Sequence, residues 1–171
     1  MILDATCGCK GIYHGNDENF TETELIFMDK RLGTFKGHPR QTRMTETIHI
    51  HPTTVASLTK LPFRDNLFTL IIYDPPWMNI SDTSWFHFRY DGWDRHTYAL
   101  TTHHANNEFH RVLKPYCPLI TKYQTPPKTA VSTLQDYIDK MSNFSLLLEL
   151  TRSSHAGQSN APVYWLVFVA K

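Results

Sequence analysis

One buried strand, cut off by two prolines, constrains the fold of this chain more than any other feature. Residues 68–73, Phe-Thr-Leu-Ile-Ile-Tyr, are apolar or β-branched throughout, and Asp74-Pro75-Pro76-Trp77 follows directly. A run without polar alternation is typical of a strand covered on both faces, as in parallel sheets flanked by helices. Because prolines cannot donate to a sheet ladder, the strand ends at Pro75. We therefore expect an α/β protein with this strand inside its sheet.

The rest of the chain alternates between strand and helix patterns. The other expected strands cover residues 2–5, 24–28, 119–123, 144–150 and 163–170, and a weaker strand or a loop covers residues 53–58. The expected helices cover residues 97–113 and 131–141. Only a Ser/Gly/Asn-rich connection separates the last two strands, which indicates an antiparallel hairpin after a largely parallel sheet. The chain has 171 residues and neither a repeat nor a linker, so we expect a single domain over residues 1–171.

Composition narrows the function classes. The formal net charge is +1, so nucleic-acid binding would depend on a local basic patch. Cys7, Cys9 and Cys117 cannot form a disulfide framework, and an odd number fits a reducing compartment. No signal peptide and no apolar run of about 20 residues is present, which indicates a cytoplasmic protein without a membrane span. The His and Cys spacings match no structural zinc site, so we expect no metal.

The ends of the expected strands carry the residues that indicate a binding site. Ligands of parallel α/β sheets bind beyond the carboxyl ends of the strands. The first strand leads into the glycine-containing segment 4–11, the second ends at Asp29, and the central one ends at Asp74. Glycine lets the backbone turn tightly against a ligand. Asp29 is placed to accept hydrogen bonds from a ribose diol; the alternatives are a helix N-cap or a solvated loop acid.

These landmarks resemble those of class I S-adenosylmethionine-dependent methyltransferases. Segment 4–11 is similar to their first motif, and residues 74–77 resemble the fourth motif of members that methylate the exocyclic amine of adenine. Segments 61–68 and 109–115 resemble those before the fourth and fifth strands, and the whole chain is similar to short phage-encoded members that finish with a strand like residues 165–168. The resemblance implies a Rossmann-like domain: a mostly parallel seven-stranded sheet, a C-terminal antiparallel hairpin and helices on both faces.

The resemblance also implies S-adenosylmethionine as cofactor. The residues expected to bind it are Asp4, Ala5, Thr6, Cys7, Gly8, Lys10, Asp29, Lys30, Ser57, Leu58 and Asp74. Thr6 and Lys10 stand where the family usually has glycine, and Ser57 stands where an acid usually contacts the adenine of the cofactor. Lys10 either crowds the turn or contacts the cofactor carboxylate.

The segment Asp74-Pro75-Pro76-Trp77 is expected to be catalytic. An exocyclic adenine amine is a poor nucleophile, because its lone pair is delocalised into the ring. Acceptance of its two N–H groups by Asp74 and the Pro75 carbonyl would stabilise the charge that develops during methyl transfer. The two prolines, Pro75 and Pro76, fix the backbone, and Trp77 offers a stacking face for the base. The alternative is a strand terminator with an aromatic plug.

An aromatic and cationic segment follows, over residues 78–100, where family members place a mobile substrate loop. The residues expected to bind substrate are Trp77, Trp85, Phe88, Arg89, Tyr90, Trp93 and Lys122. Aromatic and cationic side chains together suit bases and phosphates. The alternatives are a lid packed on the core or an interface to a second subunit.

Three functions stay open at this point. The first is N6-adenine methylation of DNA or RNA, with specificity from the aromatic loop or from a protein partner, since no separate target-recognition domain is found. The second is methylation of a smaller nitrogen nucleophile, such as a nucleotide or a metabolite. The third is a non-catalytic, cofactor-binding partner subunit. The altered glycine turn favours this function, and the presence of Asp74 argues against it. A homodimer is also possible.

Overall fold

The structure is a computed structural model, and it describes residues 1–8, 10, 13, 21, 23–37, 46–75, 95–124, 133–152 and 162–171. Several residues expected to act at the site lie outside these ranges: Pro76, Trp77, Trp85, Phe88, Arg89, Tyr90 and Trp93. Most of the expected lid over residues 78–100 lies outside them as well.

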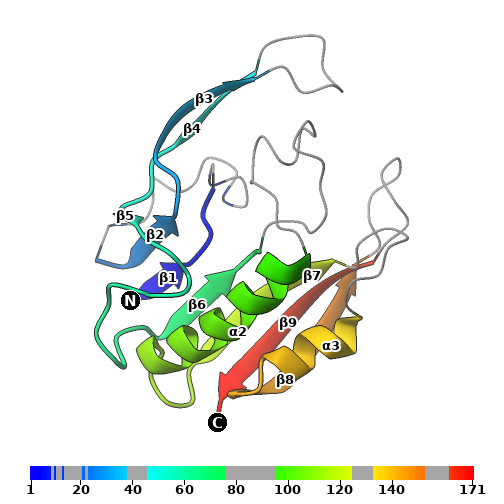
Figure 1. The fold of residues 1–171 in the computed structure, drawn as a ribbon. Coiled ribbons are helices and arrows are strands. Elements are labelled where there is room, and N and C mark those ends of the chain that lie inside the picture. Colours follow the sequence, from blue (N-terminus) through cyan, green and yellow to red (C-terminus); the bar gives the residue numbers. More distant parts are fainter. Residues whose placement is uncertain are drawn as a thin grey trace.

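Seven strands form one sheet in the order β5-β2-β1-β6-β7-β9-β8 (Figure 1). Their bounds are β1 Ile2–Asp4, β2 Leu25–Asp29, β5 Thr54–Val55, β6 Leu70–Tyr73, β7 Pro118–Gln124, β8 Phe144–Arg152 and β9 Val163–Ala170. The pairs from β5 to β7 are parallel, whereas β9 runs antiparallel between β7 and β8. The predicted α/β fold, with a mostly parallel seven-stranded sheet and a C-terminal antiparallel hairpin, is confirmed.

A second, two-stranded sheet was not predicted. β3 (Gly33–Gly37) and β4 (Glu46–Ile50) pair antiparallel, and they lie between β2 and β5 in the sequence. Figure 1 shows this ribbon standing clear of the main sheet, next to its β5–β2 edge. A signal for β4 exists in the sequence, because residues 47–51, Thr-Ile-His-Ile-His, alternate between polar and apolar side chains.

The two described α-helices, α2 (Arg95–Val112) and α3 (Leu134–Lys140), cover one face of the main sheet (Figure 1). Phe109 of α2 and Tyr137 of α3 are fully buried in the core that both helices form with the sheet. α3 begins with a capping box: the Thr133 hydroxyl accepts the Asp136 N–H, and the Asp136 carboxylate accepts the Thr133 N–H. None of the described helices is long and apolar enough to cross a membrane.

The opposite face of the sheet carries a smaller buried cluster. Cys7, Leu25 and Phe27 form it, and Tyr13 packs edge-on against Phe27 with ring centroids 5.1 Å apart. Helices on this face stay a prediction, because much of the chain between β1 and β2 lies outside the described ranges. The burial of Cys7 agrees with the expectation that it packs rather than takes part in redox chemistry.

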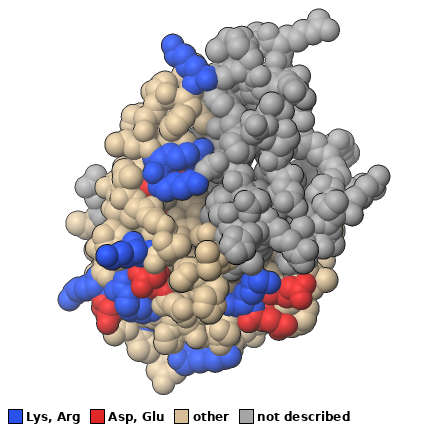
Figure 2. Space-filling view, viewed as in Figure 1, with Lys and Arg blue, Asp and Glu red and all other residues tan. Residues whose placement is uncertain are grey.

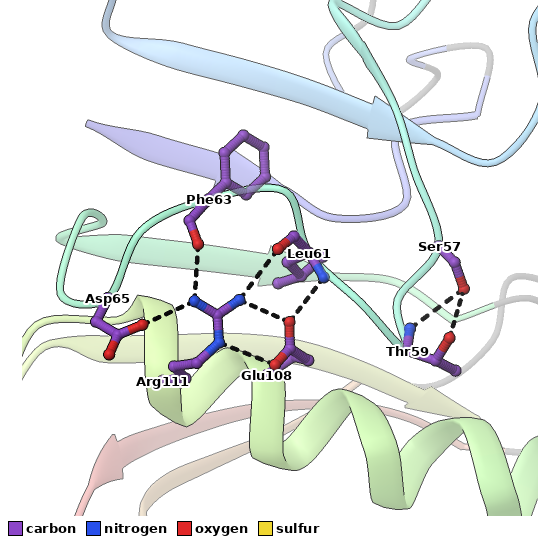
Figure 3. Close-up of polar contacts among 7 residues, drawn as sticks. All are labelled: Ser57, Thr59, Leu61, Phe63, Asp65, Glu108 and Arg111. Atoms are coloured by element: carbon purple, nitrogen blue, oxygen red, sulfur yellow. Dashed lines mark hydrogen bonds and ion pairs between the residues drawn. The ribbon is translucent and has the colours of Figure 1, made fainter.

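Arg111 on α2 holds the segment that leads into β6 (Figure 3). Its Nε and Nη2 donate to the two Glu108 carboxylate oxygens at 2.9 and 2.7 Å. Its Nη1 donates to the Phe63 carbonyl and the Asp65 carboxylate, at 2.7 and 2.8 Å, and Nη2 also donates to the Leu61 carbonyl at 3.0 Å. All five guanidinium N–H groups are thereby used. We call these five residues the Arg111 staple.

Candidate active site

Three aspartates meet at the carboxyl edge of the main sheet. Asp4 ends β1, Asp29 ends β2 and Asp74 directly follows β6. Because β1 lies between β2 and β6, the three carboxylates are close enough for the charges of Asp29 and Asp74 to act on Asp4. Asp4 and Asp29 are buried, at 1% and 8% exposure, and the Asp74 side chain is 24% exposed. We call these three residues the acid site.

Asp4 carries the strongest electrostatic perturbation of the three. Burial raises its pKa to about 7, and the negative charges of Asp74 and Asp29 act in the same direction. Hydrogen bonds from the Thr6 N–H at 3.1 Å and the Tyr13 hydroxyl at 2.9 Å oppose this rise. A positively charged ligand next to these carboxylates would favour their ionised forms, so the acid site suits a cation.

Asp29 ties the turn after β1 to the end of β2. Its Oδ2 accepts the Gly8 N–H at 3.0 Å, and its Oδ1 accepts the backbone N–H and the Nε–H of Arg31 at 2.9 and 3.3 Å. No helix follows, because the chain continues into β3, and the side chain is buried. Asp29 is therefore neither a helix N-cap nor a solvated loop acid. A carboxylate offers about four lone-pair positions, and these three bonds leave one for a ribose hydroxyl.

Thr6 and Lys10 stand at positions where the resemblance leads us to expect glycine, and their contacts differ. The Thr6 hydroxyl accepts the Asp74 backbone N–H at 2.9 Å, which links the turn after β1 to the residue after β6. Lys10 adopts φ 56°, a left-handed conformation that glycine favours, and Gly8 has φ 51°. The Lys10 ammonium lies 4.2 Å from the centroid of the Phe27 ring. This cation–π contact directs the side chain towards β2.

Lys122 lies in β7, next to β6, and its Nζ is 2.8 Å from Asp74 Oδ2. Burial raises the pKa of Asp74, and the Lys122 charge and hydrogen bond oppose that rise. Sequence reasoning expected Lys122 to bind substrate, whereas its contact in the structure is with the expected catalytic acid. Lys122 therefore orients one oxygen of the Asp74 carboxylate.

The other expected cofactor residues divide between the site and the core. The Ala5 N–H donates to the Ile72 carbonyl at 2.9 Å, and Lys30 is exposed directly after Asp29. Leu58 is 8% exposed and packs in the main core. The Ser57 hydroxyl hydrogen-bonds the Thr59 hydroxyl and N–H, at 2.9 and 3.2 Å, within a local turn (Figure 3).

Two contributors to the site, Tyr13 and Arg31, were not expected from the sequence. Arg31 lies two residues after Asp29, and an Asp side chain commonly accepts the N–H two residues on, so a local signal existed for it. Tyr13 reaches Asp4 across a turn that no periodic pattern describes. Within the described ranges, no three His, Cys, Asp or Glu side chains are arranged to hold a metal ion.

Comparison with known proteins identifies the fold. No protein-family model matches the sequence, and sequence comparison finds no curated relative. The N-methyltransferase NodS from Bradyrhizobium japonicum WM9 superposes with a TM-score of 0.58 at 13% identity, over 99% of this chain and 84% of NodS. A SAM-dependent methyltransferase from Methanosarcina mazei gives 0.57 at 12% identity, over 99% of this chain and 92% of that protein.

A protein from Pyrococcus horikoshii OT3 is similar to the same extent, with a TM-score of 0.56 at 15% identity over 99% of this chain and 81% of its own. At such low identity the likeness is one of fold. The chain therefore has the Rossmann-like fold of S-adenosylmethionine-dependent methyltransferases.

Proposed function

We propose that this protein is an S-adenosylmethionine-dependent methyltransferase that methylates the N6 amine of adenine in a nucleic acid. The observation that carries the proposal is the position of Asp74. It begins the Asp-Pro-Pro-Trp segment at the end of β6 and is hydrogen-bonded through its N–H to Thr6 of the turn after β1. This hydrogen bond links the acid of a segment that resembles an adenine-methylating motif to the turn that would hold the cofactor.

The residues of the acid site fit the chemistry of S-adenosylmethionine. That molecule carries a cationic sulfonium and an ammonium. The carboxylates of buried Asp4 and half-buried Asp74 have raised pKa values, and nearby cations stabilise their ionised forms. Asp29 would accept a hydrogen bond from a ribose hydroxyl. The turn at Gly8, where the backbone is left-handed, would lie against the methionine portion. When bound, the cofactor supplies an activated methyl group.

Asp74 then has a defined task. Its carboxylate would accept one N–H of the adenine amine, and the Pro75 carbonyl would accept the other, as charge develops on that nitrogen. Lys122 fixes Asp74 Oδ2, so the orientation of the carboxylate is set before substrate arrives. Preorganisation of this kind stabilises the transition state without a reorganisation cost during the reaction. Trp77 would stack on the base.

A smaller nitrogen nucleophile is the second candidate substrate. The likeness to NodS, an N-methyltransferase, and the net charge of +1 favour it. Asp74 would accept the N–H of either substrate, so the two candidate functions share the same chemistry and differ only in the molecule that is methylated. Incubation with radiolabelled S-adenosylmethionine and duplex DNA, single-stranded DNA, total RNA or a metabolite extract separates them. Nucleoside mass spectrometry then identifies the methylated base.

Cofactor binding is tested by isothermal titration with S-adenosylhomocysteine. Asp29→Asn should weaken binding about tenfold or more, because a hydrogen bond to a charged group contributes about 1.5–3 kcal/mol. Asp139→Asn, an exposed substitution on α3, is the matched control and should leave the affinity unchanged. Absence of binding at millimolar ligand would exclude the enzyme and leave a structural role.

The catalytic role of Asp74 is tested by Asp74→Asn. Turnover should fall by about 10²–10³ because a preorganised charge acceptor is lost, while cofactor affinity stays within a few-fold. Asp139→Asn again serves as the control, and radiolabelled methyl transfer is the measurement. Transfer by Asp74→Asn at the wild-type rate would reduce the proline motif to a strand terminator and remove the basis of the adenine assignment.

A further inference from the structure

The β3–β4 ribbon has two unlike faces. In its register Phe35 is opposite Ile48, and Gly33 is opposite Ile50. Ile48 and Ile50 are buried, at 4% and 0% exposure, so this face is apolar and covered. The alternation of side chains along a strand places the remaining positions on the other face.

The second face is exposed and rich in hydrogen-bond donors. Thr34 is opposite His49 and Lys36 is opposite Thr47, and all four are exposed, as is His51 after the strand. The Thr34 hydroxyl and His49 Nδ1 lie 3.0 Å apart, and the His49 and His51 rings are stacked at 6.1 Å. Every one of these side chains can donate a hydrogen bond. We call this set the ribbon face.

The ribbon and its flanks concentrate positive charge in a nearly neutral protein. Residues 30–51 contain five Lys and Arg and one acid, whereas the other 149 residues contain twelve Lys and Arg and fifteen acids. In the view of Figure 2, the upper part of the described surface shows Lys and Arg with little Asp or Glu, whereas charges of both signs lie side by side in the lower part. Lys30, Arg31 and Lys36 are the members of this group in the described part of the chain. The sequence bias makes this insertion the candidate for the local basic patch that a nearly neutral nucleic-acid-binding protein requires.

The ribbon is attached at the acid site. β3 begins four residues after Asp29, and the chain returns to pair Val55 of β5 with Asp29. The Ala56 N–H donates to the Asp29 carbonyl at 3.1 Å. Both ends of the insertion are thus fixed to the residue that would hold the cofactor ribose, and a polymer lying on the ribbon face would run close to the site.

We propose that the ribbon face binds the sugar–phosphate backbone of the nucleic acid that carries the target adenine, which rests on the proposed function. Lys, Thr and His side chains donate to phosphate oxygens, and contacts of this type set position without reading sequence. Two-stranded ribbons serve as DNA-binding elements in other folds. Charge complementarity favours a polyanion, and a nucleic acid supplies regularly spaced phosphates along its length.

The test uses fluorescence anisotropy with a fluorescein-labelled oligonucleotide, single-stranded and duplex, over a series of salt concentrations. Lys36→Glu should weaken binding about tenfold at low salt and reduce the slope of log Kd against log salt by about 1. Lys114→Glu is the matched control, because Lys114 is exposed and its N–H bonds the Phe68 carbonyl at the entry to β6, away from the carboxyl edge. It should change the affinity less than about twofold.

A second variant, Thr34→Ala/His49→Ala, removes donors without a charge reversal and should also weaken binding. Thermal unfolding checks that each variant folds. Equal effects of Lys36→Glu and Lys114→Glu, or a wild type that binds neither oligonucleotide, would overturn the ribbon assignment. Oligonucleotide binding that depends on Lys36, without methylation of adenine, would support the ribbon face and overturn the proposed reaction. Methylation of free nucleotides without oligonucleotide binding would overturn the ribbon face, and it would favour the smaller nitrogen nucleophile over a nucleic acid as the substrate.

Discussion

Folding has opposite effects on the charged side chains of the Arg111 staple and of the acid site. In the staple, hydrogen bonds from Arg111 lower the pKa of Glu108, and hydrogen bonds to Glu108 and Asp65 raise that of Arg111. Folding therefore favours the charged form of both side chains. In the acid site, burial raises the pKa of Asp4 and of Asp74, so folding disfavours their charged forms.

This difference indicates that the Arg111 staple stabilises the fold, whereas the acid site is arranged for ligand binding. The staple satisfies five donors with protein acceptors and fixes the entry to β6. The acid site keeps like charges together at the carboxyl edge, where a cationic ligand would relieve them. The staple should therefore dominate stability measurements, and the acid site should dominate binding and rate measurements.

The largest expected effect is in the staple. Arg111→Met should lower the free energy of unfolding by about 3 kcal/mol, since it leaves Glu108 and two backbone carbonyls without their donor. Arg111→Lys should recover at most about 1 kcal/mol, because one ammonium cannot reproduce the planar fork. Arg64→Met, an exposed change in the same segment, should cost less than about 0.5 kcal/mol. Urea unfolding measures all three, and equal losses for Arg111→Met and Arg64→Met would show that the staple is not special.

The pH dependence of stability should reveal Asp4. Its pKa is raised from 3.8 to about 7, so the folded protein retains a proton that the unfolded chain releases. Stability contributed by this group is present below about pH 4 and is lost as pH rises to about 7. Asp4→Asn cannot ionise, so its stability should rise relative to wild type by about 2 kcal/mol between pH 5 and pH 8. Parallel urea-unfolding results at both pH values would contradict a raised pKa.

Lys122 should act on rate through Asp74, given the proposed function. Lys122→Met removes the interaction that opposes the rise in the Asp74 pKa, so the acidic limb of the pH–rate profile should move to higher pH. Turnover near neutral pH should fall about tenfold, with cofactor affinity unchanged. Lys122→Arg should restore most of the profile. An unchanged profile with a raised KM would instead identify Lys122 as a substrate-binding residue.

The smallest expected effect is at Lys10, where strain and a favourable contact oppose each other. Lys10→Ala loses the cation–π contact with Phe27, about 0.5–1 kcal/mol, and keeps the left-handed backbone. Lys10→Gly loses the same contact but relieves the backbone by a comparable amount, about 1 kcal/mol, so its stability should match wild type. Thermal unfolding distinguishes them. Equal melting temperatures for the alanine and glycine variants would show that the turn carries no strain.

The main sheet could be predicted because most of its strands contain a run of apolar residues. The expected bounds of β9 agree with residues 163–170, and the expected segment 119–123 lies within β7. The β3–β4 ribbon escaped prediction because Gly33 and Gly37 bound β3 and depress its strand propensity. Its partner β4 has a period-2 pattern that was present but only five residues long.

The site was predictable only in part, because sequence shows strand ends but not contacts across the sheet. The rule that ligands bind at carboxyl ends singles out Asp4, Asp29 and Asp74. The Thr6–Asp74 and Lys122–Asp74 contacts join residues 68 and 48 positions apart, and no local pattern encodes them. The sequence indicated only that Thr6 stands where the motif usually has glycine. In the structure its hydroxyl accepts a hydrogen bond from the Asp74 N–H.

The place of β1 inside the sheet, between β2 and β6, has a consequence for synthesis on the ribosome. β1 pairs with β2 and with β6, and the register joins Ile2 to Leu70. At about 5–20 residues per second, roughly 3–14 seconds pass between the synthesis of these two partners. During this interval Leu3, which is fully buried in the finished protein, has one of its flanking strands missing. The nascent chain therefore passes through a stage with an open central strand, whereas β8 and β9 pair soon after they emerge.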